Sequence, residues 1–439
     1  MLAAALCAAR RQAGLRLSHA AVAAAWPGMV EGRSGGVRRS NQPACTGWAA
    51  SSSAAALAPP PRGPRPPPWD PAGSLRGLHT QPDGKQEEPR KAIDGGGGGD
   101  HHTHRPHPAL DPLPPWLAST LPPAAWPYAA LARLDKPAGT ALLLWPGLWS
   151  IAAAAPPGCW PDARLTALFA VGALLLRGAG CTVNDLWDRD LDARVSRTAG
   201  RPLACGAVSV RGAVAFLGAQ LGAGAAVLWQ FDPGTVALGC ASLPLVAGYP
   251  LAKRFLAWPQ AVLGLTFNWG ALLGWVAAVG AGVADPALLL AGAAMPTPTA
   301  TAALWAALAA SPTPLLFYGG GAAWTQWYDT VYAFQDKADD EAAGVRSSAR
   351  ALAAAAPGRE KAGLGLFAAA AGGLLAAGGA AAGLGAPFYG GLAVVGGYGA
   401  LQLARLDLAS PAACGAAFRA HAWLGGGVWV AVIAGRVMS

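Results

Sequence analysis

The stretch NDLWDRDLDARVSRTAGRP, residues 184–202, follows a long apolar run and carries aspartates at helical spacing. On a helix that turns about 100° per residue, Asp185, Asp188 and Asp192 fall within about 60° of one another, whereas Asp190 lies off that face. We therefore expect three carboxylates to point at one place. Acidic side chains at membrane depth are costly, and by default they indicate a functional site.

A second acidic group lies in YDTVYAFQDKADD, residues 328–340. Asp329, Asp336 and Asp340 fall within about 40° of one another by the same arithmetic, and Asp339 lies about 80° away. This group also follows an apolar segment. We therefore expect an acidic face at the end of each of two different helices.

The composition is that of a polytopic membrane protein. The chain has 439 residues, of which 53% are hydrophobic and only 13% are charged, which is too apolar for a soluble protein. The net charge of +9 does not indicate nucleic-acid binding, because the basic residues lie between apolar segments and in the leader.

The fold class that we predict is all-α, with nine transmembrane helices and a disordered N-terminal leader. Each apolar segment is close to the roughly 20 residues that a bilayer requires. The predicted spans are 137–155, 163–183, 208–230, 232–252, 259–281, 313–334, 361–384, 386–405 and 418–437.

The basic residues give the orientation of this nine-span arrangement. Nearly all lysines and arginines of the inter-span loops lie on one side, as the positive-inside rule requires, and both acidic groups lie on that same side. Residues 286–312 contain an apolar run too short to span, so we interpret them as an interfacial insertion between spans 5 and 6.

Two segments precede the first span. Residues 1–30 contain several arginines and many alanines but no acidic residue, which is typical of an organellar transit peptide. Residues 31–125 are rich in Pro, Gly and Ser, so we expect a disordered linker. The membrane domain is expected at 126–439.

The acidic faces suggest a chemistry. Two carboxylate groups at one membrane surface repel each other unless cations lie between them, and Mg²⁺ commonly bridges carboxylates to substrate phosphates. The predicted metal ligands are Asp185, Asp188, Asp192, Asp329, Asp336 and Asp340, and the nearby basic residues that would bind a diphosphate are Arg197, Arg201, Lys253 and Arg254. The implied reaction is ionisation of an allylic diphosphate.

An ion or proton transporter is the rival prediction, since transporters also use intramembrane acids. Their sites usually lie near the bilayer midplane on broken helices with repeat symmetry. Here the acids lie at span ends beside basic loops, which favours the diphosphate chemistry.

The motifs resemble those of the UbiA-type intramembrane aromatic prenyltransferases. Residues 184–203 are similar to the NDxxDxxxD signature with its RTxxRP extension, and residues 328–340 resemble the second aspartate motif. Similarity extends to RLDKPAGTALLLWPGLWS at 133–150, RGAGCTVND at 177–185 and the stretch 249–275. It is strongest to the branch that prenylates 4-hydroxybenzoate in ubiquinone synthesis.

The resemblance implies a nine-helix bundle around a central cavity, Mg²⁺ dependence, and transfer of a polyprenyl group to an aromatic ring. Asp188, Asp329 and Asp336 are the expected catalytic residues. Asp329 is one candidate for the base that removes the ring proton, although the sequence does not single one out.

Further residues are expected to bind substrate. Arg133 is our candidate for the substrate carboxylate, with a positive-inside anchor as the alternative. Arg177 lies about 20° from Asp188 around the helix and is expected to orient the acids. Asn184 stands beside the first motif, and Tyr332 has a hydroxyl one turn from Asp329.

The resemblance leaves the acceptor open among 4-hydroxybenzoate, homogentisate, chlorophyllide and haem. We expect 4-hydroxybenzoate and polyprenyl diphosphate as substrates, and an inner mitochondrial membrane location with the active site facing the matrix. A plastid membrane is the alternative. The resemblance leaves room for association with other ubiquinone-synthesis proteins.

Overall fold

The computed structural model describes residues 109–193, 198–246, 248, 256, 258–279, 305–306, 308–342 and 346–439. These residues contain helices and no β-strand, and all of them belong to one compact unit. The expected transit peptide, most of the linker and most of the 286–312 insertion lie outside the described residues.

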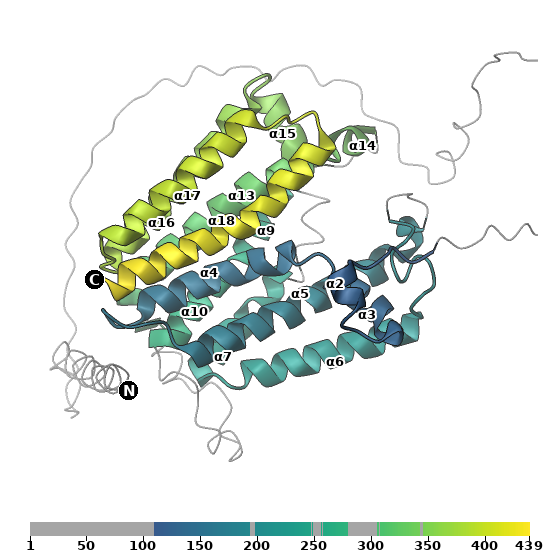
Figure 1. Cartoon of the computed structure of the whole chain (residues 1–439), viewed down its shortest axis with the longest axis horizontal. Coiled ribbons are helices and arrows are strands. Elements are labelled where there is room, and N and C mark those ends of the chain that lie inside the picture. Colours follow the sequence, from purple (N-terminus) through teal and green to yellow (C-terminus); the bar gives the residue numbers. More distant parts are fainter. Residues whose placement is uncertain are drawn as a thin grey trace, which may run out of the picture. The chain divides into compact units, whose positions relative to one another are not determined.

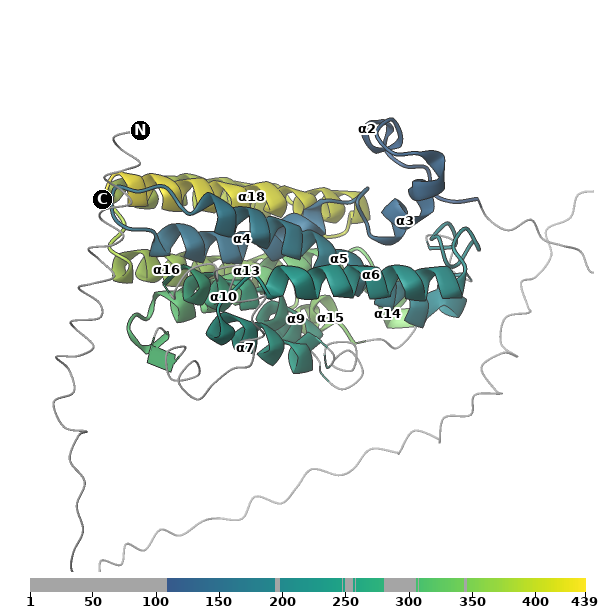
Figure 2. The same ribbon diagram turned by 90° about the horizontal axis from the view of Figure 1, so that it is seen from below.

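The helices follow the chain in this order: α2 (Pro115–Ala118), η2 (Pro123–Ala125), α3 (Trp126–Leu131), α4 (Ala138–Ala154), α5 (Ala163–Asp192), α6 (Val210–Leu228), α7 (Pro233–Ala241), α9 (Pro259–Phe267), α10 (Trp269–Val279), α13 (Thr313–Ala333), α14 (Lys337–Ala342), α15 (Ser348–Ala355), α16 (Glu360–Ala381), α17 (Ala386–Arg405) and α18 (Pro411–Val437). The long helices run broadly along one direction in both views (Figures 1 and 2).

Helices occupy all or part of each segment that was expected to span a membrane. Within the described residues, five helices are long and apolar enough to do so, namely Ala163–Asp190, Val210–Leu228, Pro259–Val279, Glu360–Ala381 and Pro411–Val437. The third of these combines α9 and α10, which meet at Asn268. Helices α4 and α7 are shorter, and α13 and α17 fall outside this set. The number of nine spans therefore stays a prediction.

Helix α13 lies at the centre of the bundle. It packs against α16, α9, α18, α10 and α4, and its Phe317, Tyr328 and Val331 are almost completely buried in the main hydrophobic cluster. Because this helix leads directly to the second acidic group, the packing of the core fixes where that group emerges.

A buried arginine ties three helices together near the C-terminus. The Nη2 of Arg436, near the end of α18, donates to the carbonyls of Ala153 in α4 and, at 2.8 Å, of Ala382 at the end of α16. The last carbonyls of a helix lack partners within the helix, and a cation there also complements the helix dipole. Arg436 therefore stabilises one end of the bundle.

Residues 109–125 differ from the expected disordered linker. They include α2 and η2, and the amide of Asp111 donates to the carbonyl of Gly200 at 3.1 Å. The indole of Trp126 donates to the carbonyl of Leu121 at 3.0 Å. The segment is ordered because it docks on the loop after α5, a contact that its proline-rich composition does not reveal.

Helices α4 and α10 cross at glycines. A Cβ atom added to Gly274 would lie 2.4 Å from the carbonyl oxygen of Gly147, and that obstacle is backbone, which cannot rotate away. Small residues at such a crossing allow membrane helices to approach closely.

We predict that Gly274→Ala destabilises the protein by about 1–3 kcal/mol, the usual cost of overpacking. Gly222 on α6 is the matched control, because a Cβ there meets nothing within 4 Å, and alanine improves helix propensity by up to about 1 kcal/mol. The measurement is thermal unfolding in detergent. A Gly274→Ala variant as stable as wild type would contradict the close crossing.

Candidate functional site

The first acidic group lies at the end of an unusually long helix. Helix α5 has 30 residues, which at 1.5 Å per residue makes it about 45 Å long, about 15 Å more than the hydrocarbon core of a bilayer. Asp185 and Asp192 are buried, with side chains 2% and 9% exposed, whereas the Asp190 side chain is 76% exposed and pairs with Arg189. The helical arrangement thus separates the inward acids from the outward one.

The two buried acids form a chain of ion pairs with two arginines. The Nη2 of Arg133 donates to both oxygens of Asp185, at 2.7 and 2.9 Å. The Nη1 of Arg201 lies 3.4 Å from Oδ1 of Asp185 and 2.8 Å from Oδ2 of Asp192. Buried carboxylates are stable when paired in this way, so positive and negative groups alternate from Arg133 to Asp192.

Arg133 follows α3 in a left-handed backbone conformation. Its φ is 58°, and within the described ranges no other residue except glycine has a positive φ. The amide of Arg133 donates to the carbonyl of Ala130 at 3.1 Å, and that of Leu134 to the carbonyl of Ala129 at 3.0 Å. This is a Schellman ending, whose left-handed position is usually glycine because other residues lose about 1–2 kcal/mol there.

The loop after α5 carries Arg201 and is held at several points. The hydroxyl of Thr198 donates to the carbonyl of Asp192 at 3.0 Å, and the amide of Arg201 donates to the carbonyl of Thr198 at 3.0 Å. Gly200 packs so tightly on Asp111 that an added Cβ would lie 2.0 Å from its Oδ1. This docking could not be predicted from the sequence, because glycines are frequent throughout the chain.

Arg177 has no ionic partner among the described residues. Its Nε is buried and unbonded, and no hydrogen bond or ion pair of this side chain occurs in the described part of the chain. The guanidinium lies against Gly139 at the start of α4, where an added Cβ would be 2.7 Å from Nε. A partly buried cation without a counter-charge is suited to bind an anionic ligand.

The second acidic group begins on α13 and continues into α14. Asp329 belongs to α13, Asp336 follows its end, and Asp340 lies on α14, with its amide donating to the carbonyl of Asp336 at 2.8 Å. All three side chains are half-buried. The ring of Tyr332 lies 4.7 Å from that of Phe418 on α18, so this tyrosine packs against the last helix.

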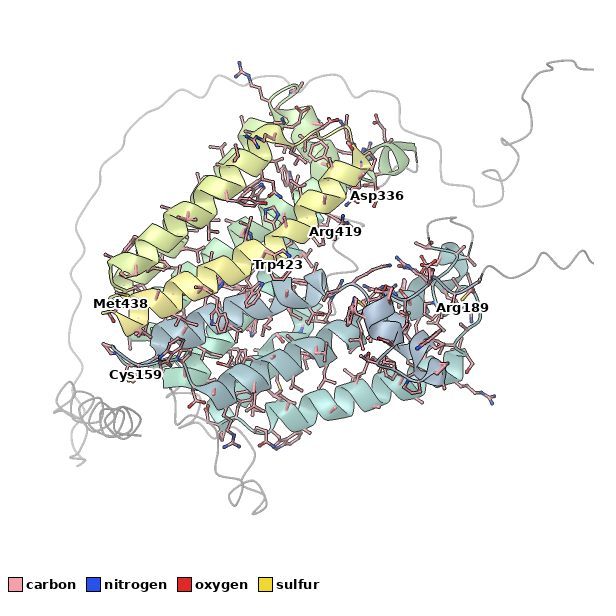
Figure 3. All side chains as sticks on the ribbon, viewed as in Figure 1. Cys159, Arg189, Asp336, Arg419, Trp423 and Met438 are labelled. Atoms are coloured by element: carbon pink, nitrogen blue, oxygen red, sulfur yellow. The ribbon has the colours of Figure 1, made fainter. Side chains whose placement is uncertain are left out.

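Both acidic groups lie at the same end of the bundle. Figure 3 shows Arg189, near the end of α5, and Asp336 toward one end of the bundle, whereas Cys159 and Met438 mark the opposite end. The interpretation of the charge pattern, which put both groups on one side, agrees with this arrangement.

The donors present suit Mg²⁺ by type, because they are carboxylates and the ion prefers hard oxygen ligands. Asp188 is half-buried and makes no hydrogen bond or ion pair with the described residues. The described ranges contain no group of three or more His, Cys, Asp or Glu side chains close enough to hold a metal. Mg²⁺ usually takes one or two carboxylates and completes its shell with phosphate and water, so the carboxylates fit the ion by type, and a metal site shared by all six aspartates stays a prediction.

The remaining predicted site residues have different outcomes. Asn184 is exposed on α5. Arg197, Lys253 and Arg254 lie outside the described residues, so their expected contacts with a diphosphate stay predictions. The structure therefore joins Arg133 and Arg201 to Asp185 and Asp192, and separately places Arg177 against α4.

Comparisons with known proteins concern the chain as a whole. A sequence model of the UbiA prenyltransferase family matches residues 143–425. The mitochondrial 4-hydroxybenzoate polyprenyltransferase of Arabidopsis thaliana is 44% identical over 321 residues, which are 73% of this chain and 71% of the relative. The human protein of the same name is 42% identical over 311 residues, 71% of this chain and 76% of the relative.

Among solved structures, a UbiA homolog from Aeropyrum pernix K1 aligns with 67% of this chain and 96% of its own, at 26% identity and a TM-score of 0.48.

Proposed function

Because the chain belongs to the UbiA prenyltransferase family, we propose that it transfers a polyprenyl group from polyprenyl diphosphate to 4-hydroxybenzoate in ubiquinone biosynthesis. The group joins the ring carbon ortho to the hydroxyl, and diphosphate is released. Relatives named 4-hydroxybenzoate polyprenyltransferase over about seven-tenths of the chain support this acceptor. The observation that carries the proposal is the pair of acidic groups, bordered by arginines, at one end of an apolar helix bundle.

The location follows from the same support. The relatives are named mitochondrial, and the five apolar helices suit an integral membrane protein. We place the chain in the inner mitochondrial membrane, with its basic loops and acidic groups facing the matrix. Residues 1–30 then serve as the transit peptide, and residues 126–439 form the nine-helix domain around a central cavity.

The acidic groups are assigned to the metal and the diphosphate. Asp188 and Asp192 from one helix, with Asp336 and Asp340 from the other side, would hold Mg²⁺. When bound, Mg²⁺ neutralises the charge that develops on the departing diphosphate. Arg201 lies beside Asp192 and donates to the phosphate oxygens as a charge-assisted partner.

The reaction needs a base as well as a leaving group. The bond between the prenyl carbon and the diphosphate oxygen breaks, and a bond from the ring carbon to the prenyl carbon forms. The ring carbon then loses its proton to a carboxylate. Asp329 lies within α13, whereas Asp336 follows the end of that helix at Ala333. Asp329 is therefore the deeper of the two carboxylates, and we assign it this role.

Arg177 is assigned to the acceptor carboxylate in place of Arg133. The Arg133 guanidinium is held by Asp185, whereas Arg177 has no described counter-charge. Arg177 lies eight residues before Asp185 on α5, about 12 Å deeper. An aromatic acid bound there would point its ring toward the acidic groups.

An ion or proton transporter, the rival class, gains no support from the family, and we do not propose it. The names of the relatives favour 4-hydroxybenzoate over homogentisate, chlorophyllide and haem as the acceptor.

We predict that membranes containing the full chain form prenylated 4-hydroxybenzoate from polyprenyl diphosphate and Mg²⁺. EDTA should abolish the product, and Asp188→Asn or Asp336→Asn should lower the rate on the order of 10²–10³-fold, as loss of a charge-stabilising group does. Asp190→Asn is the control, because Asp190 is exposed and paired with Arg189. Product from homogentisate alone would contradict the acceptor.

We predict that Gly139→Ala raises the KM for 4-hydroxybenzoate about tenfold, because the new methyl group displaces the Arg177 guanidinium and charge-assisted hydrogen bonds contribute about 1.5–3 kcal/mol. The KM for the prenyl diphosphate should not change. Gly180→Ala on α5 is the matched control, since a Cβ there meets nothing within 4 Å. An unchanged acceptor KM in both Gly139→Ala and Arg177→Gln would remove Arg177 from the acceptor site.

A further inference from the structure

Asp185 differs from the other acids of its group in what surrounds it. Its side chain is 2% exposed, and both oxygens already accept hydrogen bonds from Arg133, while Oδ1 also faces Arg201. Arginines thus take three of the roughly four lone-pair positions of this carboxylate, whereas Asp192 meets Arg201 through Oδ2 alone. Asp188, by contrast, is half-buried and makes no hydrogen bond or ion pair with the described residues.

The backbone conformation of Arg133 indicates that its contact with Asp185 serves the function of the site. A surface anchor for membrane orientation has no need for a left-handed conformation, yet Arg133 adopts φ of 58° at a position where glycine is usual. Strain of this kind persists where the surroundings determine it, and it occurs often at functional sites. Here the Schellman bonds and the ion pair with Asp185 hold the residue in place.

The guanidinium of Arg133 is fixed in place, yet some of its N–H donors make no hydrogen bond with the described residues. It has five N–H donors, and it directs Nη2 to Asp185 and Nη1 to the carbonyl of Ala130, at 2.8 Å. Its Nε makes no hydrogen bond with the described residues. Arg201 meets the same carboxylate oxygen. Asp185 therefore fixes two arginines next to each other, with donors left for another anion.

We propose that Asp185 is a positioning residue that holds Arg133 and Arg201 together to receive the diphosphate, and that it is not a ligand of the metal. This inference rests on the proposed function. Within the first acidic group, it assigns the metal to Asp188 and Asp192. It also makes α3 and the turn after it part of the active site, although both lie before the residues matched by the family model.

The first test uses Mn²⁺ alone as a probe, with the detergent-purified full chain and no substrate. Loss of the free Mn²⁺ signal in electron paramagnetic resonance measures binding. We expect Asp185→Asn to change the affinity less than twofold and Asp188→Asn to weaken it at least tenfold. If Asp185→Asn weakens Mn²⁺ binding as much as Asp188→Asn does, Asp185 is a metal ligand and the inference fails.

The second test separates positioning from general stability. Arg133→Gly removes the guanidinium and suits the left-handed backbone, but it leaves the buried Asp185 with Arg201 as its remaining cation, so its thermal stability should fall below that of wild type. Adding Asp185→Asn removes the buried charge and should restore part of that stability while the effect on substrate binding persists. The KM of Arg133→Gly for prenyl diphosphate should rise about tenfold, as should that of Asp185→Asn, because a charge-assisted hydrogen bond is worth about 1.5–3 kcal/mol.

The double variant that combines Arg133→Gly with Asp185→Asn decides whether Asp185 acts through Arg133. If it does, the double variant raises this KM no further than either single variant, because residues that act together are not additive. Multiplication of the two single effects would overturn the inference. If wild-type protein binds no Mn²⁺, the metal assignment of the proposed function fails and takes this inference with it, an outcome recognisable because wild type, Asp185→Asn and Asp188→Asn then all leave the free Mn²⁺ signal unchanged.

Discussion

The site depends on neutralising two carboxylates that are buried at the end of an apolar helix. Two ion pairs do this, one between Arg133 and Asp185 and one between Arg201 and Asp192. Carboxylates buried at the end of an apolar helix are stable only when cations neutralise them. The arginines come from the turn after α3 and from the loop after α5, so both segments must dock on the helix. The turn that carries Arg133 and the loop that carries Arg201 are thus held against α5 by this electrostatic requirement.

The two ends of the bundle are built from different kinds of contact. Glycines at the crossing of α4 and α10 bring the helices close together, and Arg436 joins three helices near the C-terminus. These contacts lie away from the acidic groups and serve packing. Toward the acidic end, half-buried aspartates and an arginine without a described partner replace close packing, which suits a region that must bind charged ligands and release one of them.

The sequence was sufficient where local periodicity decides the outcome. Helical spacing put Asp185 and Asp192 inward and Asp190 outward, because a helix turns by a fixed angle per residue. It could not reveal that Arg133 binds Asp185, 52 residues away, or that Arg177 lies on Gly139, since both contacts depend on how separate elements pack. The composition of residues 109–125 predicted disorder. It was misleading because the order of this segment comes from its docking on Gly200, which is also a contact between separate elements.

The central claim is that both acidic groups converge on one diphosphate at one membrane surface. Its most direct test is the distance between spin labels at positions 187 and 338, both exposed, in a full chain whose native cysteines have been replaced. We expect prenyl diphosphate with Mg²⁺ to give one narrow distance, shorter than with either alone. An unchanged distribution, or a separation beyond about 30 Å, the thickness of the hydrocarbon core, would contradict the claim.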